Sequence, residues 1–574
     1  MVFINWRTNF ILIIIIIFGA AIVYYLFNLQ ILQYKLYEAQ ALGQQVNFTS
    51  EAGKRGQIFC TTSQETRGAT VTSGISTEEM GLAINKENWK IFVDPQKILD
   101  KNIFAQTLSS KINQTPEEIL SKLKNQNSYV LIKSNLTPYE LVEVKKLKID
   151  GLLWRNDPER FYPQQELASQ VLGFLGGTGV GQYGVEGYYE DILKGKIGVE
   201  EEKLGFFYGL GKTSLNGSDV YLTIDYNIQF QAENLLKKEK EKNDIDSGQI
   251  IVIKPDSGKI LALANFPAFN PNYYWQERDM GIFQNSAIQK LFEPGSVMKP
   301  FTMAAAINEG KITPDTVYED KGVVVFGKST IRNFNNEVYG KQTMTQVLEK
   351  SINTGAVFAQ QQIFPEVFFN YLEKFGFTSK TGIDLQGEVY STNFNLKNGP
   401  AINYATASFG QGIEITPIQL VRAFSVFANG GRLVRPYIVE KIVNGSEEEY
   451  TKPEISKPIV SQQTVSQINS MLISVVERGF NGVAKIPGYY FAGKTGTAQV
   501  PLKNKKGYDP DKTTQSFIGY GPAFNPQFLI LVKLDNPKVP KSSLSAVPVF
   551  KELAQYIINY WHIPPDYNTD FVSK

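Results

Sequence analysis

The chain has 574 residues, 43% of them hydrophobic and 20% charged, with a formal net charge of +2. This composition is ordinary for a globular protein, the length allows about four domains, and the charge gives no indication of a nucleic-acid partner. One cysteine (Cys60) excludes an internal disulfide framework and a Cys-rich metal site, and one histidine (His562) argues further against structural zinc.

The N-terminal segment predicts a membrane anchor. Phe10 to Phe27 contains no charged residue, and a run of this length suits a transmembrane helix. A cleaved signal peptide is the alternative, but its apolar core would be about 7–15 residues with small residues at the cut, and no such site follows here. Arg7 before the run gives weak support for an N-terminus inside the cell. We expect a cytoplasmic tail over 1–9, an uncleaved anchor over 10–27 in the inner (plasma) membrane, and a catalytic region outside the cytoplasm.

Residues 28–215 predict a stalk and an α+β pedestal. Residues 28–50 have apolar positions at helical spacing. Two capping boxes, each with proline at the first helical position, begin helices after Thr115 and Thr137. Short strands are expected at 90–93 and 129–132. No cluster of reactive side chains stands out in this module.

Turn residues at Gly217-Ser218-Asp219 indicate a domain boundary, and we expect a second domain over residues 216–562. Its order of elements is strands, then helices, then strands, which indicates one antiparallel sheet with an inserted helical subdomain. The last twelve residues, 563–574, are expected to form a tail. The expected elements are a helix at 224–237, a hairpin of 249–253 with 259–264, a mostly helical stretch at 285–430, strands at 489–500, 515–521 and 528–534, and a helix at 549–560.

The first candidate site motif is Ser296-Val297-Met298-Lys299, at the start of an apolar helix. Residues i and i+3 share a helix face, so Lys299 is expected one turn from Ser296 and within reach of its hydroxyl. A serine becomes a nucleophile when a base takes its proton, and lysine serves as that base if burial or a nearby cation lowers its pKa. The pattern alone is equally consistent with an ordinary helix, and a second copy, Ser121 to Lys124, is interpreted as solvated surface.

Two further motifs follow. Ser351-Ile352-Asn353 is the favoured S-x-N copy because a predicted helix precedes it, although 214–216 and 391–393 also match. K-T-G occurs at Lys380 and at Lys494, and we favour the second because Lys494-Thr495-Gly496-Thr497 has a second threonine and an aromatic strand context. Residues 488–495 also fit the P-loop pattern, but their bulky aromatic residues and the absence of a following helix argue against a phosphate site.

S-x-x-K, S-x-N and K-T-G are together the motif set of penicillin-binding proteins and class A β-lactamases. From about residue 50 to 560 the chain resembles the class B penicillin-binding proteins, the peptidoglycan D,D-transpeptidases, most closely the septal FtsI-type branch. Cys60 stands where the family usually has aspartate, and Ile352 where it more often has serine. The supporting segments are Arg55–Phe59, Arg160–Pro163, Val171–Phe174, Gly184–Gly187, Leu222–Asp225, Glu293–Ser296, Ser408–Gly412 and Thr416–Gln419.

This resemblance implies an α+β transpeptidase domain of the penicillin-binding-protein/β-lactamase type on an elongated, dimerisation-type pedestal. It implies that Ser296 attacks the penultimate D-Ala of a stem peptide, that Lys299 is the base, that Ser351 protonates the departing amine and that Asn353 orients. Lys494, Thr495, Gly496 and Thr497 would bind the substrate, and the N–H groups of Ser296 and Thr497 would form an oxyanion hole. No metal or cofactor is implied. The implied partners are D-Ala-D-Ala stem peptides, β-lactam antibiotics, and an FtsW-type glycosyltransferase with other divisome proteins.

Three alternatives remain open at this stage. The first is an elongation-type transpeptidase, the near neighbour of the septal branch. A β-lactamase of class A would need a glutamate in an E-x-x-L-N loop, and the chain has Lys212 at that position before Leu215-Asn216. The third alternative is a catalytically silent β-lactam sensor or scaffold, although such a protein would be expected to lose motif residues and none is lost here.

Overall fold

The structure is a computed structural model that describes residues 18, 19, 22, 53–64, 76–124, 129–195, 216–397, 399–502 and 507–567. The chain divides into a unit of 1–54 with 195–216 and a larger unit of 55–194 with 217–574. Apart from residues 18, 19 and 22, the predicted anchor and stalk lie outside the described residues. Within the described ranges, no helix is both long and apolar enough to cross a membrane.

The larger unit contains the predicted antiparallel sheet. Its strand order is β11-β10-β22-β21-β20, and each neighbouring pair is antiparallel. The strand β20 is the edge that takes part in the candidate site. The bounds are β10 Ser247–Ile253, β11 Ile260–Phe266, β20 Ala492–Pro501, β21 Tyr508–Gly521 and β22 Phe528–Asp535.

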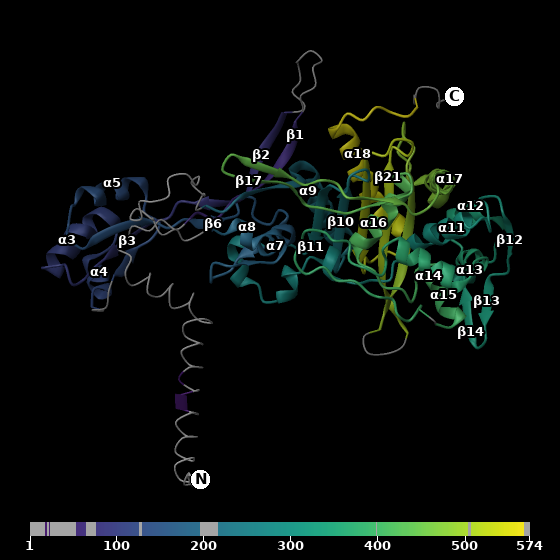
Figure 1. Cartoon of the computed structure of the whole chain (residues 1–574), viewed down its shortest axis with the longest axis horizontal. Coiled ribbons are helices and arrows are strands. Elements are labelled where there is room, and N and C mark those ends of the chain that lie inside the picture. Colours follow the sequence, from purple (N-terminus) through teal and green to yellow (C-terminus); the bar gives the residue numbers. More distant parts are fainter. Residues whose placement is uncertain are drawn as a thin grey trace, which may run out of the picture. The chain divides into compact units, whose positions relative to one another are not determined.

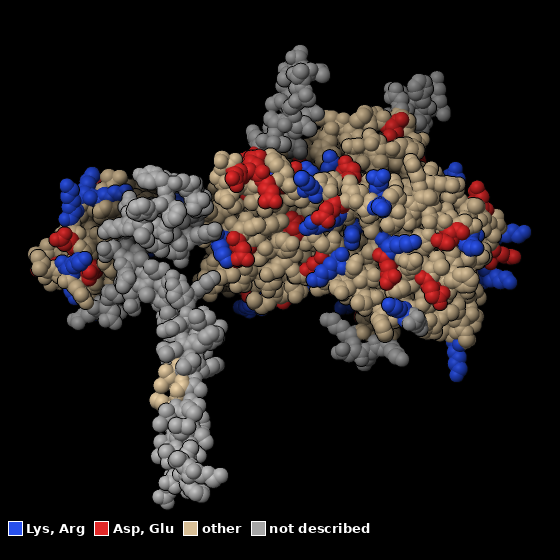
Figure 2. All heavy atoms as spheres, viewed as in Figure 1, with Lys and Arg blue, Asp and Glu red and all other residues tan. Residues whose placement is uncertain are grey.

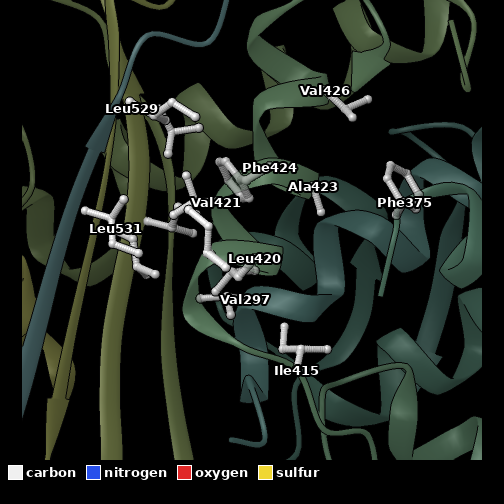
Figure 3. Close-up of a cluster of buried hydrophobic side chains, with 14 of the residues drawn as sticks. Val297, Phe375, Ile415, Leu420, Val421, Ala423, Phe424, Val426, Leu529 and Leu531 are labelled. Atoms are coloured by element: carbon white, nitrogen blue, oxygen red, sulfur yellow. The ribbon is translucent and has the colours of Figure 1, made fainter. Parts of the chain in front are cut away.

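Both faces of this sheet are buried because its strands place apolar residues at successive positions. One face packs against α9 (Tyr226–Asn243) and α18 (Ala546–Tyr560). The other packs against α16 (Pro417–Ala428), where Leu529 and Leu531 of β22 meet Leu420, Val421 and Phe424 (Figure 3). Because successive side chains of a strand point to opposite faces of the sheet, each strand contributes alternate residues to two apolar cores.

The helical subdomain gathers on one side of the sheet (Figure 1). The stretch at 285–430, predicted to be mostly helical, contains α10 to α16 but also long non-helical segments and two antiparallel strand pairs, β12 with β15 and β13 with β14. The β-branched run Val323–Val325 and the turn at Gly327 account for the second pair. The bounds are α10 Ser286–Gln289, α11 Lys299–Asn308, α12 Met344–Glu349, α13 Asn353–Gln361, α14 Pro365–Lys374, α15 Ala401–Ala407, α17 Gln462–Arg478, β12 Val317–Asp320, β13 Val323–Phe326, β14 Ser329–Arg332 and β15 Gly340–Thr343.

A second sheet joins distant parts of the chain, in the order β18-β17-β9-β1-β2-β6. Strand β1 (Ile58–Gln64) runs parallel to β9 (Asp219–Asp225), and β9 pairs with β17 (Val439–Asn444) on its other side. The sheet thus draws strands from both sides of residue 215. Its other members are β2 Ser76–Lys86, β6 Glu159–Phe161 and β18 Glu447–Tyr450.

The helix after β9 begins two residues later than the sequence predicts and extends further, over Tyr226–Asn243. Ile224 is a buried residue of β9, and Asp225 caps the helix by accepting hydrogen bonds from the N–H groups of Asn227 (2.9 Å) and Ile228 (3.1 Å). An aspartate cap satisfies amides that the first helical turn leaves without partners. The cap therefore fixes where the strand ends.

In the pedestal, both predicted capping boxes are present at Thr115 and Thr137. The helices pack on a small sheet of order β4-β3-β5 around their own apolar core. The bounds here are β3 Trp89–Val93, β4 Val130–Lys133, β5 Leu152–Asn156, α3 Lys101–Ile112, α4 Pro116–Lys122 and α5 Pro138–Lys146. Other short elements follow in both parts of the larger unit. Those before residue 215 are α6 Ser169–Leu172, β7 Phe174–Leu175, β8 Gly181–Gln182, α7 Gly184–Tyr188 and α8 Glu190–Leu193. Those after it are β16 Arg432–Val434 and β19 Ile455–Pro458.

A buried ion cluster holds the base of the pedestal together. Glu186 is completely buried and accepts from Arg55 Nη2 and Arg160 Nε, each at 2.6 Å. The Tyr162 hydroxyl donates to the same carboxylate at 3.0 Å. Burial alone would raise the pKa of Glu186, but the two guanidinium charges outweigh it and lower the pKa. On the face of the molecule in Figure 2, Lys and Arg are interspersed with Asp and Glu, in line with the small net charge.

Candidate active site

Ser296 lies in η4 (Gly295–Met298), a 3-10 turn that leads directly into α11. Val297 and Met298 are buried, and Val297 lies beside Leu420 and Ile415 (Figure 3), while Ser296 itself is half-buried. Pro300 is the second residue of α11, where a missing N–H has no helical partner to lose. The packing of its neighbours therefore fixes Ser296 and leaves its side chain partly accessible.

Two glycines let the backbone approach this turn closely. Gly410 has φ +84°, and a Cβ at this position would lie 2.1 Å from the Gly295 carbonyl oxygen. The N–H of Gly295 donates to the Gly410 carbonyl at 3.0 Å. A Cβ on Gly496 of β20 would lie 2.4 Å from Ser516 Oγ and 3.0 Å from the Pro294 carbonyl oxygen. Larger residues at either position would push the turn of Ser296 away from its neighbours.

Lys299 is completely buried, and its ammonium group points at the S-x-N segment. It donates to Asn353 Oδ1 at 2.8 Å, to the Ser351 carbonyl oxygen, and to Ser351 Oγ at 3.3 Å. Burial and the positive charge of Lys494 together hold the pKa of Lys299 well below its ordinary value. In the described part of the chain, the hydrogen bonds of the Lys299 ammonium group thus go to the S-x-N segment, and none of them goes to the Ser296 hydroxyl.

Lys494 approaches the same hydroxyl from the sheet. It is completely buried in β20, and its ammonium group donates to Ser351 Oγ at 2.9 Å. Burial lowers the pKa of Lys494 to about 7. Ser351 Oγ therefore lies between two lysine nitrogens, and the charge of Lys494 adds to burial in lowering the pKa of Lys299.

The corner between α12 and α13 presents Ser351 and Asn353. Ser351 has φ +57°, a left-handed conformation that costs a non-glycine residue roughly 1–2 kcal/mol. Ile352 is buried, which anchors the corner in the core. Asn353 begins α13, and its amide nitrogen donates to the Arg332 carbonyl at 3.1 Å while its oxygen accepts from Lys299. Strain at Ser351 is thus held by packing on one side and hydrogen bonds on the other.

The remaining predicted residues lie along β20. Thr495 is buried, and its hydroxyl is 3.3 Å from the Lys494 nitrogen. Thr497 is half-buried, and its hydroxyl lies 3.3 Å from Ser542 Oγ. Sequence patterns did not predict Ser542 as a neighbour of Thr497, since Ser542 is far along the chain and matches no motif. Because β20 is an edge strand, one side of its backbone has no strand partner within the described residues.

The other motif copies lie elsewhere. Lys380 is exposed, and the adjacent Thr381 bonds to Glu388 through both its N–H and its hydroxyl, each at 2.6 Å. Ser121 is exposed and donates to the Glu118 carbonyl of its own helix. Lys494 lies inside a strand with no helix after it, which excludes the P-loop geometry.

The lone cysteine lies outside the candidate site. Cys60 is buried in β1, and burial together with the Asp225 charge raises the pKa of its thiol to about 12. In the ranges that the structure describes, no group of three or more His, Cys, Asp or Glu side chains lies close enough together to hold a metal ion. The polar groups that meet at the S-x-N corner are the Ser351 hydroxyl, the amines of Lys299 and Lys494 and the amide of Asn353.

Residues 248–555 match the family model of the penicillin binding protein transpeptidase domain, and residues 66–205 match that of the penicillin-binding protein dimerisation domain. The chain is 33% identical over 478 residues to stage V sporulation protein D of Bacillus subtilis, covering 80% of this chain and 73% of the relative. It is 31% identical over 512 residues to the probable peptidoglycan D,D-transpeptidase PbpC of Pseudomonas aeruginosa, covering 86% and 88%.

Solved structures share the fold. Penicillin binding protein 3 from Mycobacterium tuberculosis, complexed with aztreonam, is 29% identical with a TM-score of 0.64, covering 72% of this chain and 92% of that one. Penicillin binding protein 2X from Streptococcus thermophilus is 22% identical with a TM-score of 0.74, covering 90% and 81%. These likenesses confirm the α+β fold that the sequence predicts.

Proposed function

The chain belongs to the class B penicillin-binding proteins, and from this premise we propose that it is a serine-type peptidoglycan D,D-transpeptidase with Ser296 as the nucleophile. The observation that supports this most directly is that Lys299, one turn after Ser296, and Lys494 both hydrogen-bond to Ser351 Oγ. Burial, together with the charge of Lys494, lowers the pKa of Lys299, which favours a role of Lys299 as a base.

In the first step, the Ser296 hydroxyl attacks the carbonyl of the penultimate D-Ala of a stem peptide, and neutral Lys299 takes its proton. The C–N bond to the terminal D-Ala breaks, and the departing amine receives a proton through the Ser351 hydroxyl. The product is an ester on Ser296. An amine of a second stem peptide then attacks this ester, which releases Ser296 and leaves a new amide crosslink. No metal ion or cofactor takes part.

Substrate binding falls to β20 in this proposal. The N–H groups of Ser296 and Thr497 stabilise the oxyanion of each tetrahedral intermediate, an interaction that is often the largest catalytic contribution. Lys494, Thr495, Gly496 and Thr497 hold the terminal carboxylate of the donor. Asn353 orients Lys299, which its hydrogen bond of 2.8 Å supports.

Penicillin treatment followed by peptide mapping tests this assignment. A β-lactam resembles D-Ala-D-Ala, so the adduct should lie on the tryptic peptide of residues 291–311, in which Pro300 protects Lys299 from cleavage. Ser296→Ala should show no adduct. Labelling of Ser351 or Ser121, or full labelling of Ser296→Ala, would contradict the role of Ser296. A chain that is acylated but does not crosslink stem peptides would be a silent sensor or scaffold.

The cellular role is proposed as septal, with membrane attachment through 10–27 and an FtsW-type glycosyltransferase as partner. The supporting residues are Asn353 and three segments that resemble the septal branch, Asn265–Pro267, Phe269–Pro271 and Thr416–Gln419. The proposed domains are a cytoplasmic tail (1–9), the anchor (10–27), stalk and pedestal (28–215), transpeptidase (216–562) and a C-terminal tail (563–574). A fluorescent fusion in the source cells tests the role: it should gather at division sites, whereas a distribution along the side wall would indicate the elongation branch.

A further inference from the structure

A buried carboxylate lies behind the S-x-N corner, outside the motifs. Asp320, the last residue of β12, is 2% exposed and makes no ion pair within the described residues. It is instead surrounded by hydrogen-bond donors from three segments of the subdomain. The donors are the Thr354 hydroxyl (2.7 Å), the Tyr318 hydroxyl (2.8 Å), the Gly322 N–H (2.9 Å), the Asn333 side-chain amide (2.8 Å) and the Tyr339 N–H (2.8 Å).

These donors keep the carboxylate ionised. Burial raises the pKa of Asp320, but the hydrogen bonds from Thr354, Gly322, Tyr339 and Tyr318 outweigh it and lower the pKa. An ionised carboxylate only accepts hydrogen bonds, which suits a site where every neighbour donates. An asparagine in its place would present an N–H₂ group to at least one of these donors.

The network holds Asn353 from both sides. On one side, Thr354 follows Asn353 in the chain, and it bonds to Asp320 through its hydroxyl and to the Asn333 side-chain oxygen through its N–H (3.1 Å). On the other side, the Asn353 amide donates to the carbonyl of Arg332, the residue before Asn333. Asp320 fixes Thr354 and Asn333, the neighbours that hold Asn353 from either side. It therefore fixes the Asn353 amide, whose oxygen accepts the hydrogen bond from Lys299.

The same network anchors a loop that reaches the sheet side of the site. The loop of residues 333–339 begins at Asn333 and ends at Tyr339, both bound to Asp320. Within it, the Phe334 ring lies 6.0 Å from the Lys541 nitrogen. Lys541 precedes Ser542, whose hydroxyl meets Thr497. Asp320 therefore organises a segment that touches both sides of the site.

We propose that Asp320 is a positioning residue of acyl transfer, which acts through Thr354 and Asn333 to hold Asn353 and hence Lys299 in place. The inference rests on the proposed function. Burial and Lys494 account for the lowered pKa of Lys299, and Asp320 takes no part in it. The action of Asp320 is therefore geometric, and displacement of a catalytic group by about 1 Å is enough to cost roughly 100-fold in rate.

A double-mutant cycle on the full chain tests the coupling. The acylation rate constant with a fluorescent penicillin is measured for Asp320→Asn in the wild-type and in the Asn353→Ala backgrounds, normalised to the fraction of protein that labels at saturation. Asp320→Asn should slow acylation about 10- to 100-fold in the wild type and less than about threefold with Asn353→Ala, since the cycle isolates shared action.

Asp384→Asn is the matched control. Asp384 is also a buried carboxylate, 3% exposed, and it accepts from the N–H groups of Ile438 and Val439 and from the Tyr189 hydroxyl, away from the site. Its replacement should leave the rate constant of the labelled fraction within about twofold in both backgrounds. This control separates a positioning effect from a general loss of a buried charge.

The outcomes are distinct. Equal slowing by Asp320→Asn in both backgrounds, or slowing of less than about twofold in the wild type, would overturn the positioning role. If Asp320→Asn does not fold, Thr354→Val should slow acylation and Thr354→Ser should restore it, and equal rates for the two would overturn the role as well. Absence of acylation in the wild type itself would instead refute the proposed function.

Discussion

Replacing Lys494 by alanine should slow acylation for two separable reasons. The first is lost recognition of the substrate carboxylate, since a hydrogen bond to a charged group contributes about 1.5–3 kcal/mol, or roughly 10- to 150-fold. The second is loss of the cation beside Lys299. Both nitrogens lie close to Ser351 Oγ, at 3.3 Å and 2.9 Å, so they are at most about 6 Å apart.

Two unit charges about 6 Å apart in an effective dielectric of about 20 repel by about 3 kcal/mol. A shorter separation would increase this repulsion, whereas partial protonation of Lys494, whose pKa is about 7, reduces its average at neutral pH. Lys494→Ala removes this repulsion, so Lys299 should hold its proton more tightly. Because Lys299 acts as a base only when neutral, the acid limb of the acylation pH profile should move to higher pH.

Stopped-flow acylation with a fluorescent penicillin between pH 5 and 9 measures both effects. A penicillin whose carboxylate is esterified separates them: the wild type should lose rate with the ester, whereas Lys494→Ala should discriminate little between ester and acid. Lys380→Ala is the control from the exposed K-T-G copy and should change neither rate nor profile. An unmoved or downward-moved acid limb in Lys494→Ala, or the larger loss in Lys380→Ala, would refute the reasoning.

Other predictions concern stability and the membrane anchor. Lys494→Met should raise Tm although it slows acylation. A lysine whose folded pKa is about 7 binds its proton more weakly in the native state than in the unfolded state, where the pKa is about 10.4. The free energy of unfolding of the wild type therefore falls as pH falls from about 10 to 7. Over that range the extra stability of the variant should grow to about 2–4 kcal/mol in thermal melts. A pH-independent difference in stability would contradict this prediction. Glu186→Gln should cost about 3–5 kcal/mol in urea unfolding because it removes the buried carboxylate that pairs with both Arg55 and Arg160. Glu190→Gln should cost much less, because within the described residues the Glu190 carboxylate forms an ion pair with Arg55 alone. N-terminal sequencing of the mature protein should find residues 10–27 still attached, and a start between residues 25 and 40 would indicate a cleaved signal peptide.

The sequence predicted those parts of the fold that depend on neighbouring residues. The capping boxes at Thr115 and Thr137 were found because cap and partner are three residues apart. The sheet strands followed from their apolar, β-branched runs. The start of α9 was misplaced because Ile224 fits both a helix and a buried strand, and only the tertiary pairing of β9 decides between them.

The candidate site was predictable where it carries motifs and not elsewhere. Ser296, Lys299, Ser351 and Lys494 stand in recognisable short patterns. Asp320 and Ser542 do not, because their roles come from contacts between segments far apart in the chain. The sequence also placed Lys299 within reach of Ser296, but its motifs did not predict the hydrogen bonds that Lys299 makes with Ser351 and Asn353. A motif fixes which residues meet but not which hydrogen bonds they form.

The sheet that joins β1, β9 and β17 limits how these proteins recombine. Strand β1 comes from before the matched pedestal segment, β9 from between the two matched segments, and β17 from within the transpeptidase segment. A crossover between relatives anywhere near residue 215 would place β1 of one parent beside β9 of another, in a register set by both. Hybrids made by exchange of whole domains are therefore expected to fold only when β1, β9 and β17 all come from the same parent. An isolated catalytic piece would in addition carry an open strand edge, which favours aggregation.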